Sequence, residues 1–325
     1  MVTYIVRRLL YSIPVLFAAS VLIFFSVTAV GDPLAALRQN PLFSKQTIHN
    51  IEVRNHLNDS LPRQYVYWLK SAVTDKFGSP LLQPGVKIWK DLERVIPHTL
   101  QLVFLAEILA LLVGIAIGVY SAIRQYSIFD YAATTFSFLG FAMPVFWLAL
   151  MLQILFTNIF IKWHVRIFYT SGLSSQDPGG GIHFWIDRLQ HLAIPAMTLM
   201  LLSIAQYSRF MRASMLEVVN SDYVRTARAK GLPERTVTLK HALRNALIPV
   251  VTVSALNFGA LIGGAVITES IFQLDGMGPY FLGALFSRDA YVVMAWLMVT
   301  ATAVVAFNLI ADVLYGYIDP RIRFD

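Results

Sequence analysis

The chain has 325 residues, of which 57% are apolar and 14% are charged. Soluble proteins average roughly 45–50% apolar and about 25% charged residues, so the composition excludes an ordinary soluble protein. Cysteine is absent, which excludes disulfides, cysteine-ligated metal sites and a thiol nucleophile. The formal net charge of +7 could suit nucleic acid, but the placement of the charges favours a membrane and no nucleic-acid partner.

Six apolar stretches are long enough to cross a bilayer core, which takes about 20 residues of helix. They are Leu9–Val30, Thr99–Ser121, Tyr131–Phe160, Leu192–Ser208, Ile248–Ile271 and Tyr291–Tyr317. We therefore expect an all-α polytopic membrane protein with six transmembrane helices. The first stretch has 22 residues, longer than the usual apolar core of a signal peptide, about 7–15 residues. We expect it to stay attached as an anchor.

The basic residues between the spans predict the orientation. One face, formed by residues 1–8, 122–130, 209–247 and 318–325, carries 13 Lys and Arg in 64 residues, whereas the other face carries 13 in 118 residues. Basic residues concentrate on the cytoplasmic side of membrane proteins. We therefore expect a multi-pass membrane protein with both termini in the cytoplasm.

Residues 31–98 then form an extracytoplasmic insertion between the first two spans. Within it, Leu61–Leu69 starts as a helix and carries Tyr and Trp side chains, which favour the membrane boundary. This helix could lie on the outer surface of the membrane, or it could be a docking surface for a soluble partner.

Motifs for catalysis are missing from the sequence. It has no phosphate-binding loop, zinc-binding His pair or nucleophile turn, so we expect no catalytic residue, no metal site and no enzyme activity of its own. The seven histidines, His191 among them, fall outside the predicted spans, where exposed or interfacial side chains are expected.

Three acids fall within the predicted spans, where a charge costs at least about 2–3 kcal/mol. Glu269 and Asp312 lie near span ends, and Glu107 lies eight residues from the outer end of its span. These residues are candidates for the translocation path, and Glu107 could instead form a hydrogen bond between helices. Two small-residue motifs, Gly114–Gly118 and Gly259–Gly263, favour close packing of helices.

The longest predicted cytoplasmic segment, residues 209–247, contains eight basic residues. Ser221 or Asp222 can cap a helix that runs from Tyr223 to Lys230, and Gly231 suits the left-handed position just past its end. Pro233 suits the first turn of a second helix. The pattern predicts two short helices and a sharp corner, which would suit mechanical contact with a partner. Attraction to anionic lipid would explain the charge but not the corner.

Two runs in this segment resemble the coupling segment of permease subunits of bacterial ABC importers for peptides and nickel, most closely the B-type subunit of oligopeptide and dipeptide systems. They are Arg225-Thr226-Ala227-Arg228-Ala229-Lys230-Gly231-Leu232-Pro233 and His241-Ala242-Leu243-Arg244-Asn245-Ala246-Leu247-Ile248-Pro249. Further matches include Tyr4–Leu10, Thr268–Phe272 with Gly276-Met277-Gly278, and Asp319–Arg323, so the resemblance extends over all 325 residues.

The segment departs from the general importer motif at two points. Arg225 and Thr226 replace an acid and an alanine, so that only Ala227 and Gly231 match the core of that motif. The separation of Gly231 and Pro249 is also longer than in the general pattern, as is usual in the peptide subfamily.

The resemblance implies a single permease domain over residues 1–325 with the fold of a type I ABC importer. The expected partners are a second, homologous permease, two cytoplasmic ABC ATPases that bind ATP and Mg, an extracytoplasmic substrate-binding protein and membrane lipid. This chain would bind no cofactor. The residues expected to couple to the ATPases are Tyr223, Arg225, Thr226, Ala227, Arg228, Ala229, Lys230, Gly231, Leu232, Pro233, Asn245 and Pro249.

The substrate expected from the resemblance is a peptide. Nickel chelates, glutathione and other small solutes remain alternatives within the same importer class. An ion-coupled secondary transporter is an alternative of a different class, but it needs an ion site at broken helices in mid-membrane. Only Glu107 lies deep enough to suggest such a site.

Overall fold

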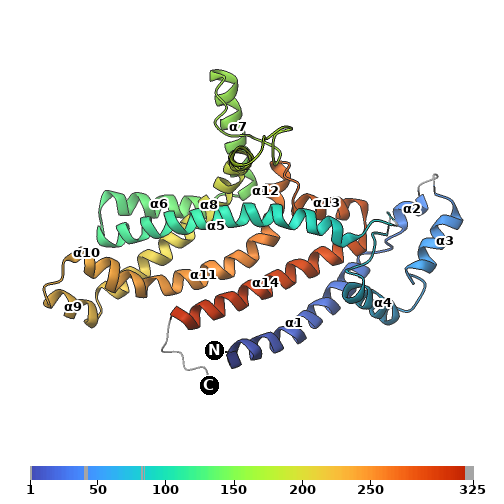
Figure 1. The fold of residues 1–325 in the computed structure, drawn as a ribbon, viewed down its shortest axis with the longest axis horizontal. Coiled ribbons are helices and arrows are strands. Elements are labelled where there is room, and N and C mark those ends of the chain that lie inside the picture. The colour runs from blue at the N-terminus through green and yellow to red at the C-terminus, as the bar shows by residue number, and fades with distance from the viewer. Residues whose placement is uncertain (1, 40–42, 82, 84, 319–325) are drawn as a thin grey trace.

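The computed structural model describes residues 2–39, 43–81, 83 and 85–318, so the motif at Asp319–Arg323 lies outside the described residues. Within these ranges the protein is all-α, as the composition predicts (Figure 1). The helices are α1 Val2–Ala29, α2 Ala35–Gln39, α3 Lys45–Arg54, α4 Leu61–Thr74, α5 Ile88–Ile123, α6 Ile128–Ala142, α7 Val145–Trp163, α8 Ile182–Val219, α9 Asp222–Ala229, α10 Glu234–Thr236, the π-helix η1 Val237–Ala242, α11 Leu243–Gly264, α12 Val266–Ile271, α13 Met277–Ser287 and α14 Ala290–Ile318.

Six helical segments of the described chain are long and apolar enough to cross a membrane, which confirms the predicted number. Their bounds differ from the prediction, because the helices continue past the apolar stretch. The second begins at Ile88 instead of Thr99, and the fourth spans Ile182–Val219 instead of Leu192–Ser208. The apolar pattern places a span end where polar residues begin. In the structure the helix continues through these polar residues, because they pack against neighbouring helices.

The predicted third span, Tyr131–Phe160, is wrong as a single helix. It breaks at Met143 and Pro144 into α6 and α7, and only α7 counts among the six candidate spans. Proline lacks a backbone N–H and disfavours helical geometry in the residue before it, which explains the break. The predicted fifth span is likewise divided, since α11 ends at Gly264 and α12 follows.

The predicted insertion, 31–98, is shorter in the structure because α5 begins at Ile88. Helix α4 starts at Leu61, as predicted, with Pro62 in its first turn. Its Trp68 is 3% exposed and packs with Phe24 of α1 and Met294 of α14. Helix α4 therefore rests against two membrane helices on one side and presents exposed side chains on the other.

The core of the molecule is the pair of long helices α5 and α8 together with α11 and α14. A Cβ added at Gly118 would lie 2.5 Å from the Cβ of Met211 on α8, so only glycine permits this approach of α5 to α8. At Gly259 of α11 an added Cβ would lie 3.1 Å from the Cα of Val304 on α14. Both small-residue motifs therefore serve packing, as predicted.

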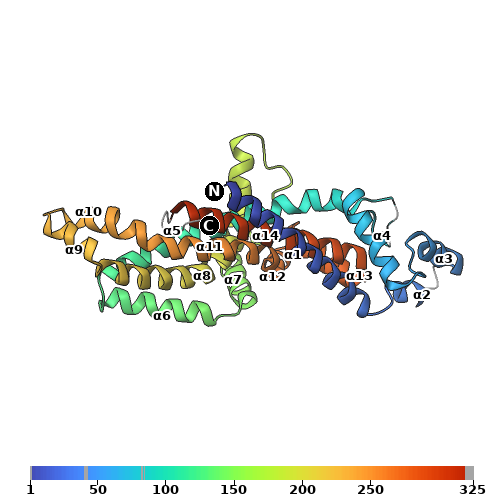
Figure 2. The ribbon, with the colours of Figure 1, turned by 90° about the horizontal axis from the view of Figure 1, so that it is seen from below.

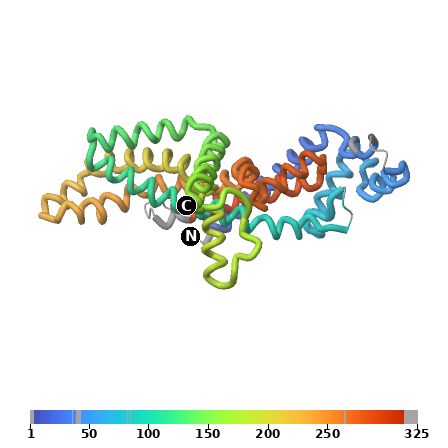
Figure 3. The backbone as a smooth tube through the Cα atoms, turned by 90° about the horizontal axis from the view of Figure 1, so that it is seen from above, coloured from blue at the N-terminus to red at the C-terminus, as the bar shows by residue number. Residues whose placement is uncertain are grey.

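The molecule is elongated, with α9 and α10 at one end and α2, α3 and α4 at the other (Figures 1 and 2). Helix α7 stands out from this array in Figure 1, and the loop after it, with the start of α8, stands out in Figure 3. The two ends are thus joined by the long helices α5, α8, α11 and α14.

Candidate functional site

The site is the segment that leaves α8 at Asn220 and enters α11 at Leu243, which includes α9 and α10. The sequence predicted a 39-residue segment from 209 to 247 between two spans. In the structure α8 continues to Val219 and α11 begins at Leu243, so the separate part is shorter and almost wholly helical. The first predicted short helix is present as α9, whereas the second, α10, has only three residues and continues through η1 into α11.

Helix α9 begins after Ser221, which occupies the N-cap position. The Ser221 hydroxyl donates to the carbonyl of Val218 at 2.6 Å and caps no N–H group of α9. Ser221 is therefore at the predicted N-cap position, but its hydroxyl does not accept the predicted hydrogen bond from an N–H group of α9. The Ser221 hydroxyl instead ties the turn to the last residues of α8.

One face of α9 anchors the helix to the body of the molecule. Val224 is fully buried and Ala227 is 6% exposed, and both belong to an apolar cluster with Met211 and Met215 of α8 and Val237 of η1. The small Ala227 side chain lets α9 lie close to its neighbours. Helix α9 is therefore packed against both α8 and η1.

The other face of α9 is open to solvent. The exposed members of the predicted coupling set are Tyr223, Arg225, Thr226, Arg228, Ala229, Lys230, Gly231, Leu232, Pro233, Asn245 and Pro249. Arg225 and Lys230 give this face a positive charge, and Asp222 lies 3.8 Å from Arg225. Nearly all of the predicted set therefore lies on the surface at this end, and Ala227 alone is buried.

The corner between α9 and α10 has the predicted glycine geometry. Gly231 has φ +74°, a left-handed conformation that strains any residue with a Cβ, and its N–H donates to the carbonyl of Arg228 at 2.9 Å. A Cβ added at Gly231 would meet nothing within 4 Å. Pro233 occupies the N-cap of α10 instead of its first turn.

An ion pair across the corner was not predicted. Arg228 near the end of α9 donates to Glu234, the first residue of α10, with Nη2 to Oε1 at 2.7 Å and Nε to Oε2 at 3.1 Å. This two-point contact joins the two short helices across the corner. The separation of six residues matches no pairing within one helix, so the sequence pattern could not identify it.

The connection from the corner into the membrane helix α11 has two further links. Asn245 donates from Nδ2 to the hydroxyl oxygen of Tyr223 at 2.8 Å, which joins the start of α11 to α9. Between α10 and α11 lies the π-helix η1, at whose end the N–H of Leu243 donates to the carbonyl of Thr238. Single π turns inside helices are rare and frequent at functional sites. Pro249 lies inside α11.

The candidate path residue Glu107 lies in a hydrogen-bond network between helices. It is 1% exposed, and its Oε1 accepts from the hydroxyl of Tyr207 on α8. Asn257 of α11 donates to Tyr207 at 3.1 Å, so the network joins α5, α8 and α11. Of the two alternatives for Glu107, the structure contains the hydrogen bond between helices. The Oε2 atom has no hydrogen-bond partner among the described residues.

Glu269, the second candidate, is also 1% exposed. Its carboxylate accepts from the Thr99 hydroxyl on α5 at 2.6 Å and from the backbone N–H of Gly278 at the start of α13, also at 2.6 Å. The Thr99 hydroxyl oxygen accepts in turn from the N–H of Met277 at 2.8 Å. Glu269 therefore fastens α12 and α13 to α5.

Asp312, the third candidate, forms an ion pair with Arg8 of α1 at 3.0 Å. This contact ties the first helix to the last. The three acids thus lie at three separate places in the chain, and their predicted role in the path remains a prediction.

The histidine prediction is wrong at His191, which lies inside α8 and is 4% exposed. Its Nδ1 is 2.8 Å from the carbonyl oxygen of Asp187, and its ring stacks on Tyr169 with centroids 3.9 Å apart. The hydrogen bond and the stacked ring explain how a polar ring is tolerated there. Among the described residues no three His, Asp or Glu side chains are grouped as metal ligands.

A second unpredicted ion pair lies where α8 approaches the turn between α5 and α6. Asp130 accepts from Arg212 at 2.6 Å and 2.8 Å, from the Tyr126 N–H at 2.9 Å and from the Ser121 hydroxyl. The hydrogen bonds from Arg212 are the main reason why the pKa of Asp130 lies below its ordinary value of 3.8. This contact supports α8 about two turns before the helix ends at Val219.

Known proteins resemble this chain along its whole length. The oligopeptide transport system permease protein AppB of Bacillus subtilis (strain 168) is 40% identical, and all of both chains is covered. The dipeptide transport system permease protein DppB of Escherichia coli (strain K12) is 34% identical over 99% of each chain.

Two solved transporters share the fold at low sequence identity. The MetNI methionine ABC transporter, in inward-facing conformations, has a chain that matches with a TM-score of 0.53 and 16% identity, over 70% of this chain and 96% of that chain. An amino acid ABC transporter crystallised with histidines matches with a TM-score of 0.51 and 13% identity, over 70% and 94%. These likenesses support the predicted type I importer fold.

The family model described as "Binding-protein-dependent transport system inner membrane component" matches residues 114–324, which include α8, the corner and α11. The match covers more than half of the chain, and the full-length relatives agree with it. The chain therefore belongs to the family of inner membrane components of binding-protein-dependent transport systems.

Proposed function

We propose that this chain is a permease subunit of an ATP-driven importer of oligopeptides or dipeptides. The names of its relatives support a peptide as substrate, since an oligopeptide permease and dipeptide permeases are among the full-length matches. In this proposal the chain forms half of the translocation path, and a second, homologous permease forms the other half.

The remaining partners follow from the class of transporter. Two ABC ATPases in the cytoplasm bind ATP and Mg and contact the α9–α10 corner, while an extracytoplasmic binding protein delivers the peptide at the opposite end. The termini and the corner face the cytoplasm, as the density of basic residues favours.

The observation that carries the proposal is the two-sided construction of α9. One face is buried against α8 and η1 through Val224 and Ala227, and the opposite face is exposed at the tip of the molecule. A helix of eight residues is too short to be stable alone in water, so its fold depends on this anchoring. A partner can therefore bind the exposed face of α9 while its buried face stays packed against α8 and η1.

The contacts give a route for motion. When the ATPases close on ATP, they displace α9, and the Arg228–Glu234 ion pair carries the displacement across the corner to α10. The Tyr223–Asn245 hydrogen bond and η1 pass it to α11. The membrane helices then pivot between inward-facing and outward-facing states, and the peptide moves through the cavity between the two permeases.

The test is the substitution Gly231→Val in the complete transporter. Because a Cβ added at Gly231 meets nothing within 4 Å, the main effect expected of the substitution is the backbone strain at φ +74°. That strain is about 1–2 kcal/mol, a factor of roughly 5–30 in an equilibrium. We expect the complex to assemble and to hydrolyse ATP, while peptide uptake per ATP falls by up to about that factor, the limit reached when only one of the two transport states carries the strain.

The matched control is Gly172→Val. Gly172 has φ +78° and equally open surroundings, but it lies in the loop between α7 and α8, far from the corner in sequence. It should leave the ratio of uptake to ATP hydrolysis unchanged. Equal ratios for both variants would refute the coupling role of the corner. Purification through this chain without any copurifying ATPase would refute the transporter itself.

A further inference from the structure

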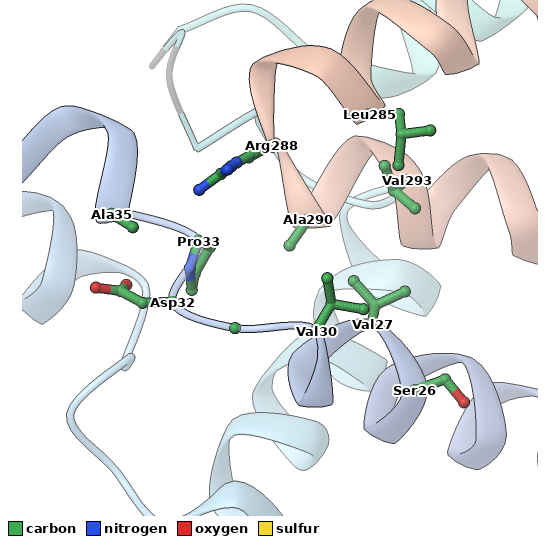
Figure 4. A pocket seen from close by; sticks show the side chains of 11 residues that line it. Ser26, Val27, Val30, Asp32, Pro33, Ala35, Leu285, Arg288, Ala290 and Val293 are labelled. Atoms are coloured by element: carbon green, nitrogen blue, oxygen red, sulfur yellow. The ribbon is translucent and has the colours of Figure 1, made fainter.

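A cleft of about 480 Å³ opens where the end of α1 meets the end of α13 and the start of α14 (Figure 4). Its volume is in the range of small-molecule sites, about 300–1,000 Å³. Most of the side chains that shape it are apolar, and one is basic. The lining includes Val27, Val30, Leu285, Ala290, Val293 and Arg288, together with the polar Ser26 and the acid Asp32.

The cleft lies at the level where membrane helices meet water. Helix α1 ends at Ala29 and α14 begins at Ala290, and both helices are candidate spans. Val30, just past the end of α1, is 89% exposed. Apolar side chains exposed at a span end are stable against the acyl chains of lipids and unfavourable in water.

Arg288 presents a cation without a partner at this cleft. No hydrogen bond or ion pair to its side chain occurs among the residues described by the structure. One acid, Asp32, lies on the cleft wall, and its carboxylate has other partners, since it lies 3.3 Å from Arg38 Nε and accepts from the Leu34 N–H at 2.9 Å. In Figure 4 the Asp32 carboxylate points away from Arg288.

The backbone holds Arg288 in place. It ends α13 in a left-handed conformation with φ +59°, which is uncommon for a residue with a side chain. The N–H of the next residue, Asp289, donates to the Ala284 carbonyl at 2.9 Å, and Asp289 Oδ1 accepts from the Val292 N–H at 3.2 Å. The turn between α13 and α14 is therefore fixed, and so is the base of the Arg288 side chain.

We propose that this cleft binds one phospholipid, with the phosphate at Arg288 and an acyl chain along Val27, Val30 and Val293. A guanidinium is suited to phosphate because it offers several N–H donors in one plane. Free phosphate would use only the cation, whereas a phospholipid also covers the apolar wall. The ligand therefore ties the first helix, α1, to the α13–α14 turn.

The experiment uses the complete transporter in its native membrane, with Val30 replaced by the photoreactive residue p-benzoylphenylalanine. After illumination, mass spectrometry of this chain should detect an adduct of phospholipid mass. Adding Arg288→Gln should lower the adduct yield about fivefold, the effect of one cation at a membrane surface. Arg288→Lys should retain most of the yield.

The matched control is Arg63→Gln, which removes an exposed arginine of α4 outside this cleft and should not change the yield. Adducts to another polypeptide in place of lipid would show that a protein covers the cleft, and would overturn the proposal. An adduct yield that is equal with Arg288 and with Gln at this position would overturn it too. Arg288 is exposed, so neither variant depends on refolding of a buried site.

Discussion

The ion pair between Asp130 and Arg212 offers the most direct test of how α8 is held before it reaches α9. The Asp130 side chain is 3% exposed and accepts two hydrogen bonds from the guanidinium, so Asp130→Asn removes the charge and one acceptor oxygen. A hydrogen bond to a charged group contributes about 1.5–3 kcal/mol. Arg212 is 28% exposed, and water replaces part of the loss. We expect a net cost of about 2–3 kcal/mol.

The assay is thermal unfolding of the purified complex, followed by size-exclusion chromatography of heated samples. At about 2–4 °C per kcal/mol, the midpoint should fall by roughly 5–10 °C. Arg212→Gln should lower it further, because it leaves a buried carboxylate without its cation. Asp222→Asn is the control, since the Asp222 side chain is fully exposed and lies 3.8 Å from Arg225.

The pH dependence has a defined sign. Because the pKa of Asp130 is lower in the folded protein, its contribution to stability is complete above its ordinary value of 3.8 and is lost as the pH falls through the folded pKa. The difference between the wild type and Asp130→Asn should therefore persist at neutral pH and shrink in acid. A midpoint for Asp130→Asn equal to that of Asp222→Asn would refute the reasoning.

Three further predictions concern the contacts between helices. Gly118→Ala should destabilise the complex by about 1–3 kcal/mol through overpacking against α8, whereas Gly283→Ala, in open space on α13, should not; equal melting midpoints would contradict this. Glu269→Gln leaves one acceptor oxygen for two donors, the Thr99 hydroxyl and the Gly278 N–H. Hydrogen exchange at the start of α13 should therefore become faster. Unchanged exchange rates would count against the anchoring role of Glu269. Tyr207→Phe should destabilise the protein by about 1–3 kcal/mol, because it leaves the buried Glu107 carboxyl without its donor. Adding Glu107→Met should recover most of the lost thermal stability. No recovery would contradict the pairing of these two side chains.

The sequence predicts the spans well because the cost of placing polar groups in hydrocarbon acts on every residue of a span. It predicts their ends poorly, because a helix supported by neighbours continues through polar residues. Residues 182–191 of α8 illustrate this, since Asp187 and His191 are buried there with local hydrogen-bond partners. The break at Pro144 has a local cause that the apolar pattern alone does not register.

The corner was predictable because its chemistry is local: Gly231 and Pro233 act through their own backbones. The ion pair across the corner was not predictable, because Arg228 and Glu234 come into contact only after the chain has turned. The partner of Glu107 is Tyr207, a hundred residues further along the chain, so no local pattern reveals their contact.

The π-helix η1 has a geometric consequence for the corner. In an α-helix each residue advances the chain by about 1.5 Å and, at 3.6 residues per turn, rotates it by about 100°. If the wide turn before Leu243 tightened to α-helical pairing, the register would slip by one residue, and α9 and α10 would rotate by that angle about the axis of α11. Such a slip either happens or does not. The segment can therefore change only between discrete registers, and it cannot rotate α9 and α10 by small, continuous amounts in this way.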